Sequence, residues 1–285
     1  MPEFPHYYLT LPSGALTQGD IWLDLPSPML LPVSKVAIVI TPRCDFAHEK
    51  TPSVNYIPAI GFDDYIEGAL PMLLEREIAR LDTQLRDLEI PLPVYEMLEL
   101  GASTESIVEE LGREAEAATL TKRNAADIQR FKENFQKITD LRKVIDSKIQ
   151  DPTILGSLIP ARELRKFREQ LLKNQINDAH MLPPCIGISS QPLIFLLRHV
   201  TSCDIRCVQL AHSCLSVEQW ESRRNQNLSH LTPLTAFKSM PERVARLKGP
   251  FLEQLVSRFV ALFSRVGVPD LTNSEFTSLI GDDQI

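Results

Sequence analysis

The sequence predicts an α+β fold: a small, strongly bent β-barrel, split by a long helical insertion, with a C-terminal helix packed on the barrel. Three observations lead to this prediction. Short β-branched runs bounded by turn-forming residues occur both in residues 1–61 and after residue 178. Between these segments, apolar residues recur at helical spacing. A last amphipathic pattern begins near residue 250.

Composition limits the classes of protein to which the chain can belong. At 285 residues and 44% hydrophobic, it can bury a substantial core. The formal net charge of -7 and the pI of about 5.5 disfavour a surface that tracks DNA, so no DNA partner is expected. The longest apolar run is too short to cross a bilayer, and no membrane partner is expected. Five irregularly spaced cysteines and the absence of a secretory-signal pattern favour a cytoplasmic location.

Residues 1–61 are expected to form the first half of the barrel. Residues 35–41 are β-branched and apolar on both faces, which is typical of a central buried strand. Pro42 ends this strand because proline has no N–H to donate to a sheet. Shorter runs at 21–23 and 54–60 predict two further strands.

Residues 62–178 are expected to form an insertion of antiparallel helices. Residues 60–120 carry 15 acidic and 4 basic side chains, whereas residues 121–175 carry 13 basic and 7 acidic ones. Opposite charges favour pairing of the two segments, although each exposed pair contributes only ~0.2 to 1 kcal/mol, so the apolar seam supplies most of the stability. The seam residues are Leu74, Ile78, Leu81, Leu85 and Leu88 in the first segment and Ile128, Phe131, Phe135, Ile138, Leu141, Ile145 and Ile149 in the second.

The β pattern returns after the insertion. Apolar runs at 193–197 and 205–210 predict two strands, and the polar residues 201–204 are expected to separate them. The hydrophilic stretch 221–238 predicts a loop.

A final helix is expected over about residues 250–266, because Gly267 stops the pattern and Pro269 prevents its resumption. With the strands before it, this helix completes a segment, residues 179–270, that holds the second half of the barrel. The polar residues 271–285 are expected to form a flexible tail.

The order of motifs in the two flanks resembles the PemK/MazF family of small β-barrels. Members begin with Gly-Asp-Ile and an apolar strand, continue with a basic residue that leads a buried strand ending in Ser or Thr, and finish with a helix headed by Arg-Val/Ile-x-x-Leu. The matching residues here are Gly19-Asp20-Ile21, Lys35 through Thr41, Val54 through Ile60, Phe195 through Val208, and Arg243 through Leu247.

The resemblance implies a bacterial stress, toxin–antitoxin or phage-defence context, and one alternative activity, metal-independent endoribonuclease. An Arg with a Ser or Thr is implicated in RNA cleavage by the family's ribonucleases. The candidate catalytic set here is Lys35, Thr41, Arg43 and His48, with RNA as the partner. Lysine lacks the guanidinium fork that holds a phosphate through two hydrogen bonds, and this disfavours inherited nuclease activity.

The leading prediction is therefore a non-enzymatic binding or regulatory protein. Its barrel is the scaffold, and the insertion binds another protein or a second copy of the chain, because long amphipathic helices supply such contacts. A small-ligand sensor is the second alternative.

The segment 41–48 holds the candidate ligand site. Arg43, Cys44, Asp45 and His48 follow a buried strand, and this strand end, Thr-x-x-Cys-Asp, also resembles groups of uncharacterised bacterial proteins. The functional interpretations are a small-ligand or phosphate site, or a Cys44 nucleophile activated by His48. The favoured interpretation is structural: Cys44 packs as a small hydrophobe and Asp45 caps the following turn.

No metal site and no cofactor are predicted. Cys203, Cys207, His212 and Cys214 suggest zinc, but the short thiol spacing typical of structural zinc sites is missing, so buried free thiols are expected. The basic side chains of residues 121–149 are expected to be solvated or paired with the acidic segment rather than to bind nucleic acid.

Overall fold

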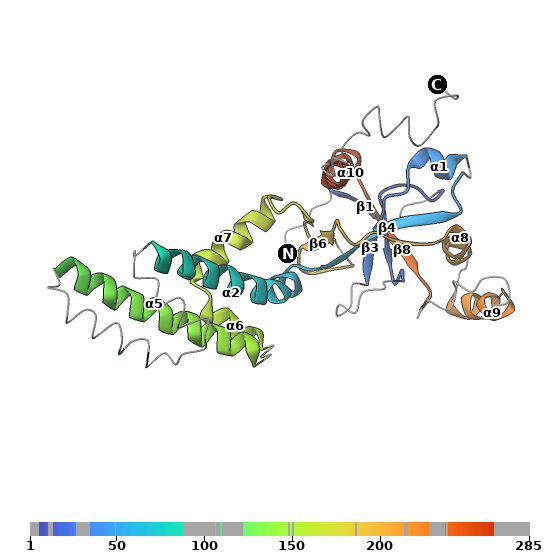
Figure 1. Cartoon of the computed structure of the whole chain (residues 1–285). Coiled ribbons are helices and arrows are strands. Elements are labelled where there is room, and N and C mark those ends of the chain that lie inside the picture. The colour runs from blue at the N-terminus through green and yellow to red at the C-terminus, as the bar shows by residue number, and fades with distance from the viewer. Residues whose placement is uncertain are drawn as a thin grey trace, which may run out of the picture. The chain divides into compact units, whose positions relative to one another are not determined.

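The computed structural model describes residues 6–10, 14–26, 35–48, 50–87, 106, 109, 122–147, 149, 151–185, 187–213, 216–227, 237 and 239–264 (Figure 1). The chain divides into two compact units, one comprising residues 1–62 with 170–285 and the other residues 63–169. Within the described ranges the fold is mixed α+β, with eight helices and eight strands. None of these helices combines the length and apolar composition that a bilayer crossing requires.

The strands form one antiparallel half-barrel sheet in the first unit. Their order is β1-β8-β2-β3-β4-β6-β5. Strand β7 lies off this path and pairs with the first half of β4. The bounds are β1 (Tyr8–Thr10), β2 (Asp20–Leu23), β3 (Val36–Val39), β4 (Ser53–Gly61), β5 (Ala179–Leu182), β6 (Leu193–Leu196), β7 (Thr201–Asp204) and β8 (Glu242–Leu247).

Strand β4 joins the two ends of the chain. One edge pairs with β3, with Ile57 opposite Ile38. The other edge pairs with β6, with Ala59 opposite Phe195, and further along with β7. The prediction that segments before residue 62 and after residue 178 share one sheet is therefore confirmed.

Both faces of the sheet are buried, and side chains alternate between them. On β3, Val36 and Ile38 belong to the core cluster that includes Leu255 of α10 (Gly249–Phe263). Ala37 and Val39 belong to a second cluster, which includes Val208 of α8 (Ile205–Ser213) and Trp220 of α9 (Val217–Asn227). Because successive side chains on a strand point to opposite faces, a strand covered on both sides is apolar throughout. The predicted packing of the C-terminal helix on the sheet is also observed.

Two predictions after β6 were wrong. Residues 205–210 belong to helix α8, and the polar residues 201–204, expected to separate two strands, form β7. The Asp204 carboxylate accepts a hydrogen bond from the N–H of Arg206 at 2.8 Å and so caps the start of the helix. The buried residues of α8 are Cys207, Val208 and Ala211, which has the spacing of a helix rather than of a strand.

Two further segments differ from expectation. Residues 243–247, expected to head the terminal helix, form most of β8, which lies between β1 and β2 in the sheet. Residues 221–227, expected to be a loop, belong to α9, which the fully buried Trp220 anchors. Apart from residue 237, the rest of that predicted loop, residues 228–238, lies outside the described residues. The predicted tail, 271–285, and Cys214 lie outside them too.

In the described ranges, four helices lie between β4 and β5 in the sequence. They are α2 (Phe62–Arg86), α5 (Lys122–Asp146), α6 (Pro152–Leu158) and α7 (Ala161–Leu172). In the unit of residues 63–169, the Glu77 carboxylate of α2 accepts a hydrogen bond from Lys137 of α5 at 3.2 Å, and Tyr65 stacks on Phe167 of α7. This ion pair joins the acidic and basic segments as the charge pattern predicts.

Candidate functional site

The candidate catalytic residues Lys35 and Thr41 lie at opposite ends of one strand. Lys35 is exposed just before β3, whereas Thr41 is buried just after it. At ~3.3 Å per residue of extended chain, six residues separate them by about 20 Å. Lys35 and Thr41 of one chain therefore cannot hold the same phosphate group.

The Thr41 hydroxyl is engaged by the backbone. It accepts a hydrogen bond from the N–H of Asn55 at 2.7 Å, and it lies 3.5 Å from the carbonyl oxygen of the same residue. Thr41 is 1% exposed. The side chain thus extends the pairing of β3 with β4 beyond the last strand residue, which is a structural role.

The segment after Thr41 forms the short helix α1 (Arg43–Ala47). The Cys44 side chain is exposed, so the expectation that it packs as a small hydrophobe was wrong. Its sulfur lies 3.5 Å from the Asp45 carboxylate, and no hydrogen bond joins it to the His48 imidazole in the described structure. Asp45 closes the following turn through its backbone carbonyl, which accepts from Lys50 at 3.0 Å. The described structure therefore does not pair the Cys44 thiol, as a nucleophile, with the His48 imidazole as its base.

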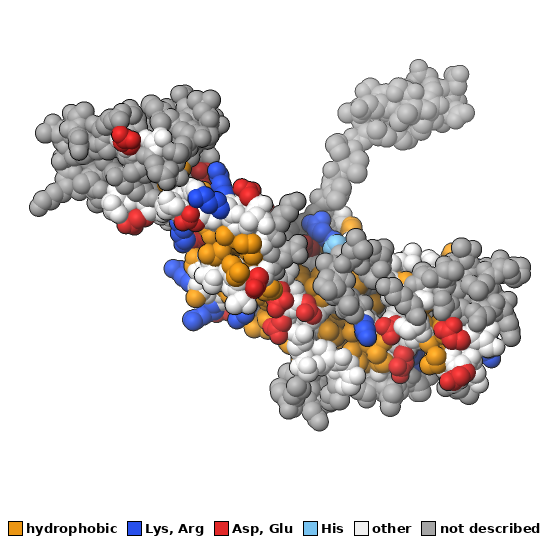
Figure 2. All heavy atoms as spheres, turned by 90° about the horizontal axis from the view of Figure 1, so that it is seen from below, with side chains coloured by type: hydrophobic (Ala, Val, Ile, Leu, Met, Phe, Trp, Pro, Cys, Tyr) orange, Lys and Arg blue, Asp and Glu red, His pale blue; other side chains and the backbone are white. Residues whose placement is uncertain are grey.

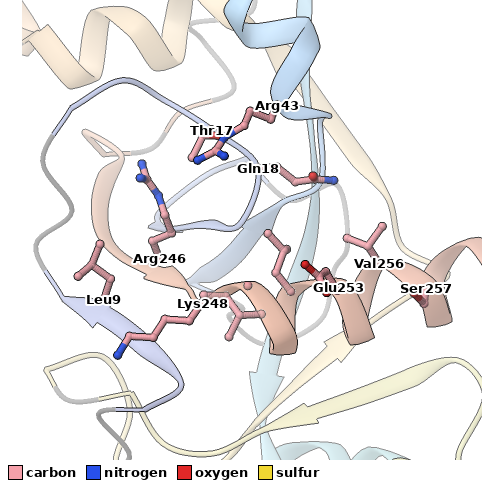
Figure 3. A pocket seen from close by; sticks show the side chains of 12 residues that line it. Leu9, Thr17, Gln18, Arg43, Arg246, Lys248, Glu253, Val256 and Ser257 are labelled. Atoms are coloured by element: carbon pink, nitrogen blue, oxygen red, sulfur yellow. The ribbon is translucent and has the colours of Figure 1, made fainter.

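Arg43 is the member of the candidate set that reaches a pocket. The pocket has a volume of about 530 Å³ and lies between the start of α10, the end of β8 and the segment before β2 (Figure 3). Its lining residues are Leu9, Thr17, Gln18, Arg43, Arg246, Leu247, Lys248, Gly249, Leu252, Glu253, Val256 and Ser257.

A buried carboxylate fixes the polar wall of this pocket. Asp20 is fully buried, and its carboxylate accepts hydrogen bonds from Arg246 Nε at 2.6 Å, from Arg243 Nη1 at 3.2 Å and from the N–H of Thr17 at 2.9 Å. Arg246 Nη2 also donates to the carbonyl oxygen of Ala15 at 3.0 Å. Because a buried charge requires partners, Asp20 holds both arginines in place.

Gly19 allows the segment before β2 to approach helix α10. Its φ of +87° lies in the left-handed region, and an added Cβ would lie 2.8 Å from Cδ2 of Leu252. Its carbonyl oxygen accepts from Leu247 at 2.9 Å, and its N–H donates to Val39 at 2.8 Å. The positive φ favours glycine, and any larger residue would have to displace the end of the Leu252 side chain, which lines the pocket.

The described cysteines outside α1 are structural. Cys203 and Cys207 are buried and free, as predicted, and Cys185 is buried and free as well. Burial raises the pKa of these thiols to about 11 for Cys185, about 12 for Cys203 and about 11 for Cys207, which leaves them protonated at neutral pH. Within the described ranges, no group of three His, Cys, Asp or Glu side chains converges in a way that could hold a metal ion.

Sequence reasoning found Arg43 but missed its companions in the pocket. From the sequence, Asp20 belongs to the motif that begins a strand, and Arg246 belongs to the motif expected to head the terminal helix. Their pairing spans 226 positions of the chain. The available signal was an acidic residue at a strand start and two arginines in a second apolar motif, because charged residues within apolar runs are seldom buried without a partner.

Comparison with known proteins gives no further assignment, because no family model matches the chain and no similar curated protein or solved structure is found. Fold and site together define an α+β protein with a half-barrel sheet and a pocket whose polar wall carries arginines. The likeness to PemK/MazF barrels stays a prediction.

Proposed function

We propose that the protein is a non-enzymatic binding or regulatory protein, in which a PemK/MazF-like barrel, split by the helical insertion, is the scaffold. The insertion binds another protein or a second copy of the chain. By the family resemblance, the setting is the cytoplasm of a bacterium under stress or phage attack.

The observation that carries this proposal is an exposed apolar face on α6. Ile154 is 43% exposed, and Leu158, one helical turn later, is partly exposed. Ile149, which the sequence pattern places in the apolar seam, is 37% exposed just before the helix. Figure 2 shows hydrophobic side chains gathered on the helical unit. Clustered exposed apolar side chains mark interaction surfaces in soluble proteins.

The helix that carries this face is firmly held. Leu155 and Ile159 are buried, and the Asp151 carboxylate caps the helix by accepting from the N–H groups of Thr153 and Ile154. A rigid helix loses little conformational entropy when a partner binds its exposed face. The apolar face is therefore pre-organised for a partner.

The test uses the full chain with Ile154→Asp. Size-exclusion chromatography with light scattering measures self-association, and affinity capture from the native cell measures other partners. We expect Ile154→Asp to abolish the association that the wild-type protein shows, because a charge in an apolar interface is costly. Thr153→Asp is the matched control, since it adds the same charge beside the face and at a helix N-terminus that favours it. Equal association of both variants would refute the proposal.

The endoribonuclease alternative is not favoured by the site. It requires Lys35 and Thr41 to act together, and the two lie at opposite ends of β3. It predicts metal-independent cleavage of single-stranded RNA that is lost in Lys35→Ala. Incubation of the purified protein with a mixed RNA pool in a chelating buffer tests it directly.

A further inference from the structure

We propose that the pocket between β8, α10 and the segment before β2 binds the phosphate group of a small phosphomonoester. This inference goes beyond the proposed function, because it concerns the sheet unit and does not depend on the apolar face of α6. It rests on two arginines, on a buried hydroxyl without a partner, and on the size and walls of the pocket.

Two guanidinium groups from different elements line the pocket. Arg43 of α1 is exposed and makes no side-chain hydrogen bond or ion pair in the described structure. Arg246 of β8 uses Nε for Asp20 and Nη2 for Ala15, and these bonds leave the Nη1 hydrogens for a ligand. Its side chain is 20% exposed, so it is fixed but reachable. Planar guanidinium forks match the geometry of phosphate oxygens.

Charge around the pocket favours an anion at this position. Asp20 is shared by Arg243 and Arg246, so the three groups together keep one positive charge, and Arg43 adds a second. Like charges that line one pocket repel each other until an anion lies between them. The first turn of α10 also lines the pocket, and the start of a helix carries a partial positive charge.

Thr17 supplies an independent indication of a ligand. It lines the pocket and is only 8% exposed, yet its hydroxyl has no hydrogen-bond partner among the described residues. Buried polar atoms in folded proteins are nearly always paired. The hydroxyl oxygen is shielded from solvent in this structure, so a phosphate oxygen or a water satisfies it only after the Thr17 side chain turns toward the pocket.

The remaining walls show that the ligand is larger than a phosphate ion. The pocket of about 530 Å³ falls in the range of small-molecule sites, and Leu9, Leu252 and Val256 give it an apolar side. In Figure 3 the Lys248 ammonium points away from Arg246, so it is not assigned to the phosphate. Glu253 lines the pocket from α10 and disfavours a second anionic group. A single phosphate attached to an apolar moiety fits these walls.

The test measures binding of inorganic phosphate and phenyl phosphate to the full chain by calorimetry at constant ionic strength. We expect both to bind, with phenyl phosphate the tighter because its ring reaches the apolar wall. Arg43→Ala is expected to weaken both affinities roughly tenfold, the effect of losing a hydrogen bond to a charged group. The same variant should keep its melting temperature without ligand, because the Arg43 side chain has no hydrogen-bond or ion-pair partner among the described residues.

Two further variants make the outcome decisive. Arg198→Ala is the matched control, since it removes an exposed arginine that pairs with Asp178 and lies outside the pocket lining. Glu253→Gln is expected to tighten phosphate binding by removing repulsion. Wild-type protein that binds neither probe, or Arg43→Ala that binds both as tightly as the wild type, would overturn the inference. The Ile154→Asp variant should bind both probes normally, which separates this test from that of the proposed function.

Discussion

A buried histidine makes stability depend on pH in a way that can be calculated. His180 on β5 is 0% exposed, and its Nδ1 lies 3.3 Å from Nη1 of Arg258. Arginine can only donate, so Nδ1 is the acceptor and the proton of the neutral ring sits on Nε2. Arg258 is held in turn by the carbonyl oxygen of Ile176, to which Nη2 donates at 2.6 Å.

Burial, with a smaller contribution from the Arg258 charge, lowers the pKa of His180 to about 3 from its ordinary value of 6.5. The unfolded chain therefore binds a proton at mildly acidic pH while the folded chain does not. The stability that neutral His180 allows is fully present above pH 6.5 and is lost progressively as the pH falls toward 3. Between about pH 7.5 and about pH 5 the loss is about 2 kcal/mol.

The assay is urea unfolding at several pH values for the wild type and His180→Gln. We expect His180→Gln to be less stable at neutral pH, because its amide must fit beside Arg258. Its stability should also fall by about 2 kcal/mol less than that of the wild type on acidification. His199→Gln, which replaces an exposed histidine, is the control and should follow the wild type. Parallel pH profiles for the wild type and His180→Gln would refute the assignment of a neutral, buried ring.

Three further predictions concern stability and reactivity. Gly19→Ala should cost about 1 to 3 kcal/mol in urea unfolding, because its φ is positive and its Cβ would meet Leu252 at 2.8 Å; an unchanged midpoint would contradict the close approach. Glu77→Gln should cost about 1 to 3 kcal/mol, because the buried carboxylate pairs with two cations, and circular dichroism during unfolding measures this. Cys44→Ser should remove a fast phase of native thiol modification, since Cys44 is exposed; a fast phase that persists in full would show that another thiol is accessible.

The sequence predicts correctly those elements whose side chains follow a regular pattern of burial. Residues 36–39 are apolar throughout because α10 covers one face of the sheet and α8 with α9 covers the other. The long helices α2 and α5 showed their seams because helix packing repeats every three to four residues. Such patterns depend on local geometry alone, so the sequence carries them directly.

Short elements at the boundary of the sheet were not predictable in this way. The polar residues 201–204 form a strand because the free edge of β4 supplies partners for their backbone groups, with Cys203 opposite Val54. The more apolar residues that follow form α8, which covers the sheet instead of joining it. Whether a short segment joins a sheet depends on which strand edge lies beside it in the fold, and the side-chain pattern of four residues does not specify that edge.

The sequence by itself determined the α+β class, the central strands and the long helices, and it made Arg43 a candidate site residue. Only the tertiary structure decided that Arg43 shares a pocket with Arg246 and that Asp20 holds Arg246 in place. The reason is physical: periodicity reports the face on which a side chain lies, whereas a site depends on distances between residues hundreds of positions apart. Those distances follow from strand order, which the pairings along the whole sheet set together.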